Sequence, residues 1–282
     1  MANKEIVEKL REQALELRKN LIRLCSQERI HIGGDMSSAD LMTVIWLYAL
    51  KYDVKNPKWD ARDRFVLSKG HASAVTSFAQ AIRGCYDIDD VFNEYAKDNG
   101  RFGMHSCNLI NPYVDVSTGS LGHGLPIAVG MAQALRMKKS DNRVYVVMGD
   151  GEADEGSVWE AAMYARHYNL GNLIVWLDRN SLQVSSLTED VIALEPFADK
   201  WRAFGWDVIE ADGHNISEMV DIVDSLPSPD SAVPRIVICR TTKGRNISFI
   251  ENQVEWHLGI FNTDELCNKA LDDVQTAFEG GK

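Results

Sequence analysis

Two short apolar runs lie on either side of a longer amphipathic segment in the middle of the chain. The runs are Val144–Met148 and Leu173–Leu177, and neither contains an internal Gly or Pro. Between them, from about Glu155 to Tyr168, apolar residues recur with helical spacing. Strands that are hydrophobic along their whole length are typical of a parallel sheet buried on both faces. The segment therefore predicts a strand, a helix and a second, parallel strand.

The same alternation continues along the rest of the chain. Further strands are predicted at Arg64–Leu67, Trp206–Glu210 and Arg235–Arg240. Helices are predicted at residues 4–26, 39 to about 50, from about 72, 87–100, 125–137, 197–204, 216–226 and in a tail from about 264. This order predicts an α/β fold with a doubly wound, mainly parallel sheet and helices on both faces. Because no repeat or linker is evident, we expect residues 1–282 to form a single domain.

Two glycine-containing loops precede predicted helices. The first, HIGGDMSS, holds His31 and Gly33–Gly34, and Ser37 or Ser38 is the expected N-cap of the following helix. The second, SKGH, places His71 at the carboxyl end of a strand. A single His in a turn commonly only bonds the backbone, so these loops do not by themselves indicate a function.

Polar residues gather where the two central strands end. Gly149-Asp150-Gly151 follows the first strand, and Asn180 follows the second. In open parallel sheets, ligands bind outside the carboxyl ends of the strands. The glycines allow a phosphate to approach the backbone, and a helix amino end favours anions. The Asp150 carboxylate would repel a phosphate unless a divalent cation bridged them, so the pattern favours Mg²⁺ over the alternative of a simple turn with a capping Asp.

Composition and charge narrow the possible partners and the compartment. The net charge of −11 argues against nucleic acid or an anionic membrane as the main partner. The five cysteines are scattered, and no CxxC pair exists, which is typical of free thiols in a reducing compartment. The first helix carries charges of both signs and lacks the apolar core of a signal peptide, so a cytoplasmic location is expected.

The motif GDG followed about thirty residues later by Asn resembles the fingerprint of proteins that bind thiamine diphosphate. The wording EGSVWEAAMYARHYNLGNLIVWLDRN is similar to the transketolase version of it. HIGG, RFVLSKGH, GSLGHG and TTKG with a later WH also resemble transketolase segments, in the family's order. The resemblance extends from about residue 5 to 262, which is far more specific than any one motif.

The resemblance implies a set of cofactor and metal contacts. Mg²⁺ would be bound by Asp150, Asn180 and the backbone carbonyl of Leu182. Thiamine diphosphate would be contacted by Gly34, His71, Gly119, Ser120, Leu121, Asp150, Gly151, Glu152, Asn180, Lys243 and His257. Alone, Lys243 would more often be a solvated surface charge, and a Gly-rich loop is often only a tight turn.

The resemblance also implies catalytic roles for His31, His105, His257 and Glu155. The histidines would line the substrate channel and hold sugar oxygens, with neutral and charged forms both accessible near pH 7. The family's Glu at this position lies near the cofactor at the subunit interface. The chain departs from the family at Ser106, where a Pro is common, and at His123, where many relatives have Gln.

The resemblance covers only the amino-terminal, diphosphate-binding domain of full-length transketolases. It therefore implies one subunit of a split transketolase, with the pyrimidine-binding domain supplied by a partner chain. The implied reaction is transfer of a two-carbon ketol unit from a ketose to an aldose. Assembly from two copies of each chain is the simplest symmetric arrangement. Which sugars serve as donor and acceptor, and whether they are phosphorylated, stays open.

Three alternative functions have weaker support. The α component of a 2-oxo acid dehydrogenase or decarboxylase also carries GDG and works with a partner, but the set of histidines resembles that used in sugar chemistry. A nicotinamide dehydrogenase is disfavoured, because no GxGxxG follows a first strand. A non-catalytic subunit that has kept the fold is opposed by the intact pair Asp150 and Asn180.

Overall fold

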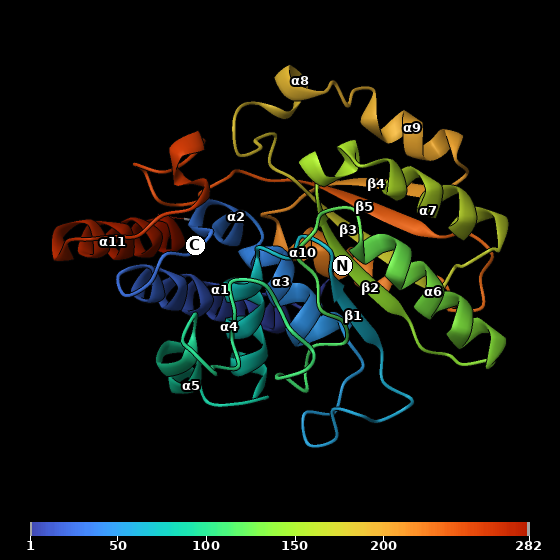
Figure 1. Cartoon of the computed structure of the whole chain (residues 1–282), viewed down its shortest axis with the longest axis horizontal. Coiled ribbons are helices and arrows are strands. Elements are labelled where there is room, and N and C mark those ends of the chain that lie inside the picture. The colour runs from blue at the N-terminus through green and yellow to red at the C-terminus, as the bar shows by residue number, and fades with distance from the viewer. Residues whose placement is uncertain (1, 281–282) are drawn as a thin grey trace.

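Five parallel strands form one central sheet in the computed structural model, which describes residues 2–280 (Figure 1). The strand order across the sheet is β1-β2-β3-β5-β4. The strands are β1 Arg64–Leu67, β2 Val144–Gly149, β3 Leu173–Arg179, β4 Asp207–Asp212 and β5 Arg235–Arg240. Every residue of β2 and β3 is buried, as their continuous apolar sequence predicts.

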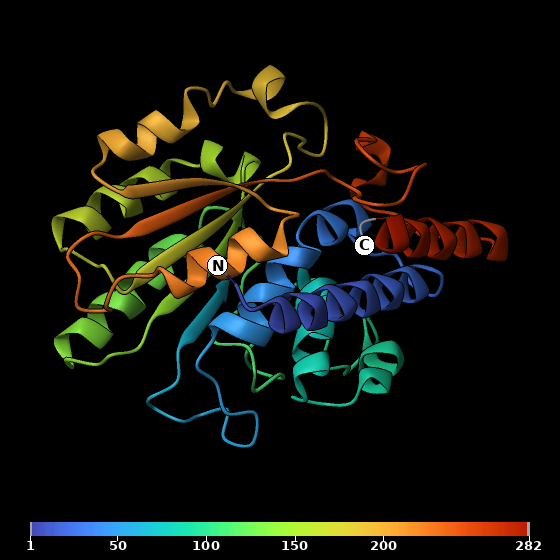
Figure 2. The same ribbon diagram turned by 180° about the vertical axis from the view of Figure 1, so that it is seen from behind.

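Alternate residues of each strand enter two separate cores, because successive side chains of a strand point to opposite faces. Tyr145 and Val147 of β2 join one core, and Val144, Val146 and Met148 join the other. The first core is covered by α3 (Ala39–Val44), α4 (Ser73–Arg83) and α10 (Ile216–Asp224). The second is covered by α6 (Gly124–Met137), α7 (Gly156–His167) and α9 (Phe197–Ala203), so helices lie on both faces (Figures 1 and 2). The predicted doubly wound fold is confirmed.

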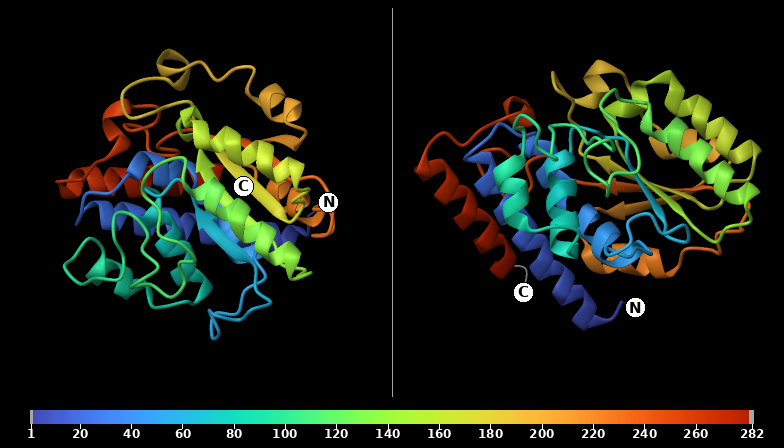
Figure 3. Two further views of the ribbon diagram at one scale, coloured as in Figure 1. Left: turned by 45° about the vertical axis from the view of Figure 1, so that its right-hand side comes forward. Right: turned by 60° about the horizontal axis from the view of Figure 1, so that its bottom comes forward.

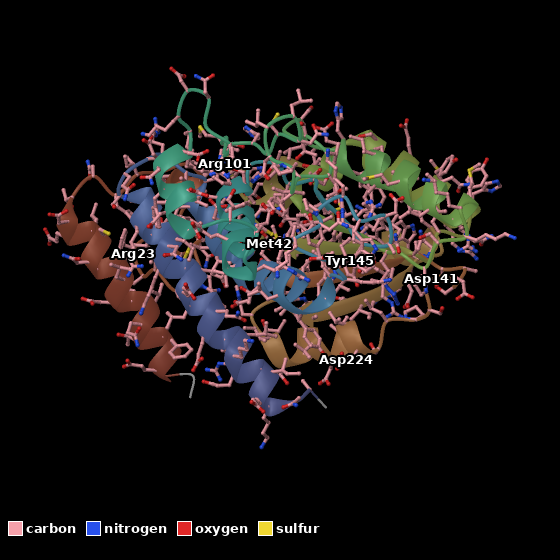
Figure 4. The ribbon with its side chains drawn as sticks, turned by 90° about the horizontal axis from the view of Figure 1, so that it is seen from below. Arg23, Met42, Arg101, Asp141, Tyr145 and Asp224 are labelled. Atoms are coloured by element: carbon pink, nitrogen blue, oxygen red, sulfur yellow. The ribbon has the colours of Figure 1, made fainter. Side chains whose placement is uncertain are left out.

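Two long helices form an outer layer beyond the first core. They are α1 (Lys4–Cys25) and α11 (Asp264–Gly280), and they run side by side (Figure 3). The predicted helical tail is therefore present. Seen from below, Met42 of α3 and Tyr145 of β2 lie inward of these helices, in the first core (Figure 4). None of the helices in residues 2–280 is long and apolar enough to cross a membrane.

Segments far apart in the sequence are joined next to α1. Ile30 and Gly259 form an isolated antiparallel bridge, and each amide donates to the other's carbonyl at 3.0 Å. The Phe261 amide donates to the Cys25 carbonyl at 2.8 Å. These bonds hold residues 257–261 across the start of α2 (Ile32–Ser37).

The sequence prediction was wrong for residues 32–37, whereas the helical segment expected from residue 39 to about 50 is present over residues 39–49. The expected loop is the helix α2, which includes Gly33 and Gly34, and an alanine Cβ at Gly33 would lie 2.7 Å from the Trp256 carbonyl oxygen. Ser38 is the N-cap residue of α3, as expected, but its hydroxyl donates to the Gly34 carbonyl and not to an amide of α3. The Ser37 hydroxyl donates to Asp178 at 2.6 Å. The helix predicted to reach about residue 50 ends at residue 44 and continues as the π-helical segment η1, residues 45–49.

One other helix is shorter than predicted. The helix expected at residues 87–100 is the shorter α5 (Ile88–Glu94). The helix predicted from about Glu155 to Tyr168 is confirmed as α7 (Gly156–His167), and the 3-10 segment η2 (Gly151–Asp154) precedes it. Two short segments complete the described elements, α8 (Thr188–Val191) and the 3-10 segment η3 (Val254–His257). That residues 1–282 form a single domain stays a prediction.

Candidate active site

Four strand ends meet around one small cavity at the carboxyl edge of the sheet. The register pairs Gly149 of β2 with Asp178 of β3, and Asp178 with Cys239 of β5, so the residues that follow these strands emerge together. The cavity holds about 120 Å³. Its lining consists of Gly34, Lys69, His71, Leu121, Gly149, Asp150, Gly151, Glu152, Asn180, Leu182, Gln183, Val184, Ser185, Lys243 and His257. Most of the predicted cofactor contacts and all three predicted metal ligands therefore lie together.

Asp150 and Asn180 are both buried and held by nearby backbone amides. The Asp150 carboxylate accepts from the Gly151 amide at 2.8 Å and from the Ser181 amide at 2.6 Å. Burial, followed by the charge of Asp178, raises the pKa of Asp150 above its ordinary value. The side-chain oxygen of Asn180 accepts from the Leu182 amide at 3.1 Å.

The donor set at this position fits a hard cation. One carboxylate, one amide oxygen and the Leu182 carbonyl are oxygen donors, and Mg²⁺ combines a few such ligands with phosphate oxygens and water. No three His, Cys, Asp or Glu side chains between residues 2 and 280 form a group that could hold a metal. The residues present therefore suit Mg²⁺ shared with a phosphate, and do not suit a site made only of His, Cys and acidic side chains.

Asp178 is the centre of a buried network that sequence analysis missed. Its carboxylate forms an ion pair with Lys69 and accepts from Thr241, from Ser37 at 2.6 Å and from Asn180 at 3.0 Å. Burial alone would raise the pKa of Asp178, but the Lys69 charge and these hydrogen bonds hold it below its ordinary value. The network orients Asn180, because Asp178 fixes which way its amide points. The available signal was a Lys and an Asp at the ends of two strands in one sheet.

Lys243 reaches into the cavity from the loop after β5. Its ammonium group donates to the carbonyls of Leu182 and Gln183 at 3.2 and 3.0 Å, and it lies 3.0 Å from Nδ1 of His257. Burial, with the neighbouring Lys69 charge, lowers the pKa of Lys243 to about 8. Lys69 and Lys243 line the cavity together with the carboxylates of Asp150 and Glu152. A phosphate could therefore bind there if a divalent cation bridged it to Asp150.

The four predicted histidines gather beside Lys243. The His31 ring centroid lies 5.1 Å from that of His71, 5.3 Å from that of His257 and 5.9 Å from that of His105. Burial and nearby cations lower the pKa of His31 to about 4 and of His257 to about 3, and that of His71 falls well below its ordinary value. The expectation that charged forms are accessible near pH 7 is therefore wrong for these three rings. Nδ1 of His31 is buried without a hydrogen-bond partner.

Glu152 joins the loops around the cavity. Its carboxylate accepts from Ser68, from the Gly122 amide at 2.9 Å and from the Gly149 amide at 3.1 Å. Burial raises the pKa of Glu152 above its ordinary value. These protein donors already use both oxygens of Glu152. The contacts therefore favour a role in holding the loops together, and not the direct contact with the cofactor that was predicted.

The remaining predicted residues lie around the cavity, outside its lining. Gly119 sits against the His105 ring, with 3.5 Å between an added Cβ and the ring carbon Cδ2. Gly70 and Gly119 approach so closely that a Cβ on Gly70 would lie 2.8 Å from the Gly119 nitrogen. Ser120 and Glu155 are exposed, and Glu155 is the N-cap residue of α7. The structure therefore separates the buried strand-end cavity from the more exposed glycine-rich loop at residues 119–124.

Comparisons with known proteins agree with this arrangement. Residues 17–271 match the transketolase thiamine diphosphate binding domain. One subunit of the apulose-4-phosphate transketolase of Phocaeicola vulgatus is 38% identical over 278 residues, which are 97% of this chain and 96% of that protein. The 6-deoxy-6-sulfo-D-fructose transketolase subunit SqwG of a Clostridium species is 36% identical over 275 residues, 94% of this chain and 98% of that protein.

A solved structure gives the same result for the fold. The transketolase from Campylobacter jejuni superposes with a TM-score of 0.84 at 26% identity, covering 97% of this chain. The match spans only 43% of that transketolase. Because the domain match covers most of the chain and the strand-end cavity carries the expected residues, the chain belongs to the transketolase family and contains its thiamine diphosphate-binding domain.

Proposed function

We propose that this chain is the thiamine diphosphate-binding subunit of a two-chain transketolase. The observation that carries the proposal is the match to separately encoded transketolase subunits over 96% and 98% of their own lengths. The cavity supports it, because its lining supplies oxygen ligands and two ammonium groups at the carboxyl edge of the sheet. The proposed reaction moves a two-carbon ketol unit from a ketose to an aldose.

In this proposal, the cavity holds the diphosphate end of the cofactor through Mg²⁺. Asp150, Asn180 and the Leu182 carbonyl are the proposed ligands, and His71, Gly151, Lys243 and His257 the proposed diphosphate contacts. When bound, thiamine diphosphate supplies the electron sink that stabilises a carbanion. A cavity of about 120 Å³ is smaller than the roughly 300–1,000 Å³ of ligand pockets that enclose their ligands, which supports a site completed by a second surface.

The histidines are proposed to act on the sugar as neutral hydrogen-bonding groups. The lowered pKa values of His31 and His257 leave both rings uncharged at pH 7, so each has one N–H donor and one acceptor nitrogen. In His257 the acceptor Nδ1 already faces the Lys243 ammonium, which leaves the Nε2–H to donate. The unpartnered Nδ1 of His31 is available for a hydroxyl or carbonyl oxygen. Together with His105, these rings would position the sugar and exchange protons with its oxygens.

The partner chain is proposed to cover the exposed loops and to supply the pyrimidine-binding domain. Ser120 and Glu155 face outward, as expected for residues at a subunit interface. Large apolar side chains are also exposed on the neighbouring helices α6 and α7 and in the loop after β3. They are Ile127, Met163, Tyr164, Tyr168, Val184, Leu187 and Ile192. Two copies of each chain remain the proposed assembly.

The donor is proposed to be a ketose that carries an anionic group. The support is that two relatives are named for such sugars, apulose 4-phosphate in one and 6-deoxy-6-sulfo-D-fructose in the other. Because one name specifies a phosphate and the other a sulfo group, the proposal leaves the anion of this chain's substrate open.

A ketol-transfer assay with thiamine diphosphate and Mg²⁺ tests the proposal. The assay is run on this chain alone and with a candidate partner chain that carries a transketolase pyrimidine-binding domain, using phosphorylated and sulfonated ketoses as donors. Activity only in the presence of the second chain is the expected result. A 2-oxo acid with an electron acceptor is the matched control, and turnover there without ketol transfer would favour the dehydrogenase alternative. No activity in either assay, with cofactor binding intact, would favour a non-catalytic subunit.

A further inference from the structure

A chain of buried polar side chains runs from α1 to the loop that carries Lys243. Arg18 of α1 donates both terminal nitrogens to Asp40 of α3, at 2.8 and 2.6 Å. Oδ2 of Asp40, which also accepts from Arg18, lies 3.0 Å from Nδ1 of His214, in the turn between β4 and α10. Nε2 of His214 lies 2.9 Å from the backbone nitrogen of Thr242, which directly precedes Lys243.

The partners of His214 determine its tautomer. A backbone N–H can only donate, so Nε2 must accept the hydrogen bond from Thr242. The ring proton therefore lies on Nδ1, where it donates to Asp40. Burial alone would raise the pKa of Asp40, but Arg18 and His214 hold it well below its ordinary value, so the carboxylate stays charged and acts as an acceptor. Each member of the chain fixes the orientation of the next.

The other bonds of residues 241–244 show what the His214 contact adds. The Thr241 hydroxyl donates to Asp178, and the Gly244 amide donates to the Gly33 carbonyl at 2.8 Å. Between these points, the Thr242 amide is held by His214. The loop is thus fixed on both sides of Lys243, whose ammonium group has to reach the cavity from this backbone.

We propose that Arg18, Asp40 and His214 form a positioning relay that holds the Thr242 amide and thereby aims Lys243 at the bound diphosphate. The proposal rests on the proposed function, because it assigns Lys243 a diphosphate contact. His214 touches neither the cavity nor its ligands and acts only through Thr242. A purely structural role would instead affect folding stability and cofactor affinity together.

Two substitutions at His214 separate these roles. Gln can place its side-chain oxygen near the position of Nε2 and so keep an acceptor for the Thr242 amide. Asn is shorter and places its amide near the position of Nδ1. The Thr242 amide then has no acceptor. Losing one hydrogen bond predicts about tenfold weaker binding of thiamine diphosphate with Mg²⁺ for His214→Asn. His214→Gln is expected to stay within about threefold of wild type.

Chemical rescue gives an independent test. Asp40 and His214 line a cavity of about 440 Å³ that lies between α1, α10 and α11. Removing the ring in His214→Ala leaves space that is reachable from this cavity, so added imidazole is expected to restore cofactor affinity. Pyrrole, which has a similar ring but no acceptor nitrogen, is the matched control and should restore nothing.

The measurements are calorimetric titration with thiamine diphosphate and Mg²⁺, and thermal unfolding, on the full chain with and without its partner. The proposal predicts that Asn and Gln variants have similar melting temperatures but different affinities. Equal affinities of the two variants, or equal rescue by pyrrole, would overturn the relay. If wild type itself fails to bind thiamine diphosphate with its partner present, the proposed function falls, and the relay falls with it.

Discussion

The cavity at the strand ends and the loops beside it are built in opposite ways. Asp150, Lys243 and Asp178 are each at most 2% exposed, and other protein groups hold each of them. In the loop after β3, Leu187 is 50% exposed and Ile192 is 55% exposed. The chain thus organises the strand-end cavity in advance and leaves the neighbouring loop as an open surface. Changes in the cavity should therefore alter cofactor binding or folding, while changes in the exposed loops should alter association.

The largest expected effect comes from Asp150→Asn. This substitution keeps the shape of the side chain but removes the charge proposed to bind Mg²⁺. Because loss of a residue that merely supports a metal ligand costs about 10–100-fold, loss of a ligand should lower activity by more than about 100-fold. Calorimetry with thiamine diphosphate and Mg²⁺ checks the binding. Asp154→Asn is the control, because its carboxylate bonds Gln183 and lies outside the cavity lining. Unchanged Mg²⁺-dependent binding in Asp150→Asn would contradict the metal assignment.

The second prediction concerns folding stability. Lys69→Met leaves Asp178 charged and buried without its ion-pair partner, so the free energy of unfolding should fall by about 3–5 kcal/mol. Lys97→Met removes an ammonium group from the pair with Glu28, which lies at the surface, and should cost less than about 1 kcal/mol. Urea denaturation measures both. The Lys69→Met, Asp178→Asn double variant should recover part of the loss, and a further additive loss would show that the pair is not coupled.

The third prediction uses the lowered pKa of Lys243. Burial shifts this pKa from an ordinary value of 10.5 to about 8, so between those pH values the unfolded chain binds more protons than the folded chain. The stability of the cofactor-free chain should therefore gain a contribution as pH rises from about 8, while affinity for the diphosphate falls because the ammonium group loses its charge. Titrations at several pH values check both trends. Lys243→Met should lack this pH dependence, and an identical profile would assign it to another group.

The smallest effect on the chain itself is expected in the exposed loop. Ile192→Ser should change the free energy of unfolding by less than about 0.5 kcal/mol, because the side chain is mostly solvated already. Its effect should appear as weaker association with the partner chain, measured by analytical ultracentrifugation. Val233→Ser is the matched control. Val233 lies just before β5, at the amino-terminal ends of the strands, whereas the cavity lies at their carboxyl ends. Equal association of the two variants would remove the loop from the proposed interface.

The same contrast explains which parts of the molecule the sequence could predict. The strands at Val144–Met148 and Leu173–Leu177 are predictable because burial on both faces requires uninterrupted apolar residues. Asp150 and Asn180 follow from the general rule that ligands bind at strand ends. The Lys69–Asp178 pair joins residues 109 positions apart, and no local pattern reports such a contact.

The α2 region shows where local sequence preference gives the wrong prediction. Two adjacent glycines disfavour a helix, so a loop was the reasonable prediction at Gly33–Gly34. Tertiary contact reversed that preference, because the Trp256 carbonyl approaches Gly33 too closely for any side chain. Local propensity therefore failed where a segment from the other end of the chain determines the conformation.

The bridge between Ile30 and Gly259 has a consequence for biosynthesis. The Cys25 thiol and the Gly259 carbonyl that it contacts are 234 residues apart, and Lys243 and His257 also lie late in the sequence. During translation, α1 leaves the ribosome long before residues 257–261 and α11 exist to cover it. The side of α1 that packs against α11 therefore lacks its cover for most of synthesis, whereas α3 and α4, which also pack against α1, are made soon after it. Binding by chaperones is expected to be directed to this helix, and the strand-end cavity is among the last parts of the protein to form.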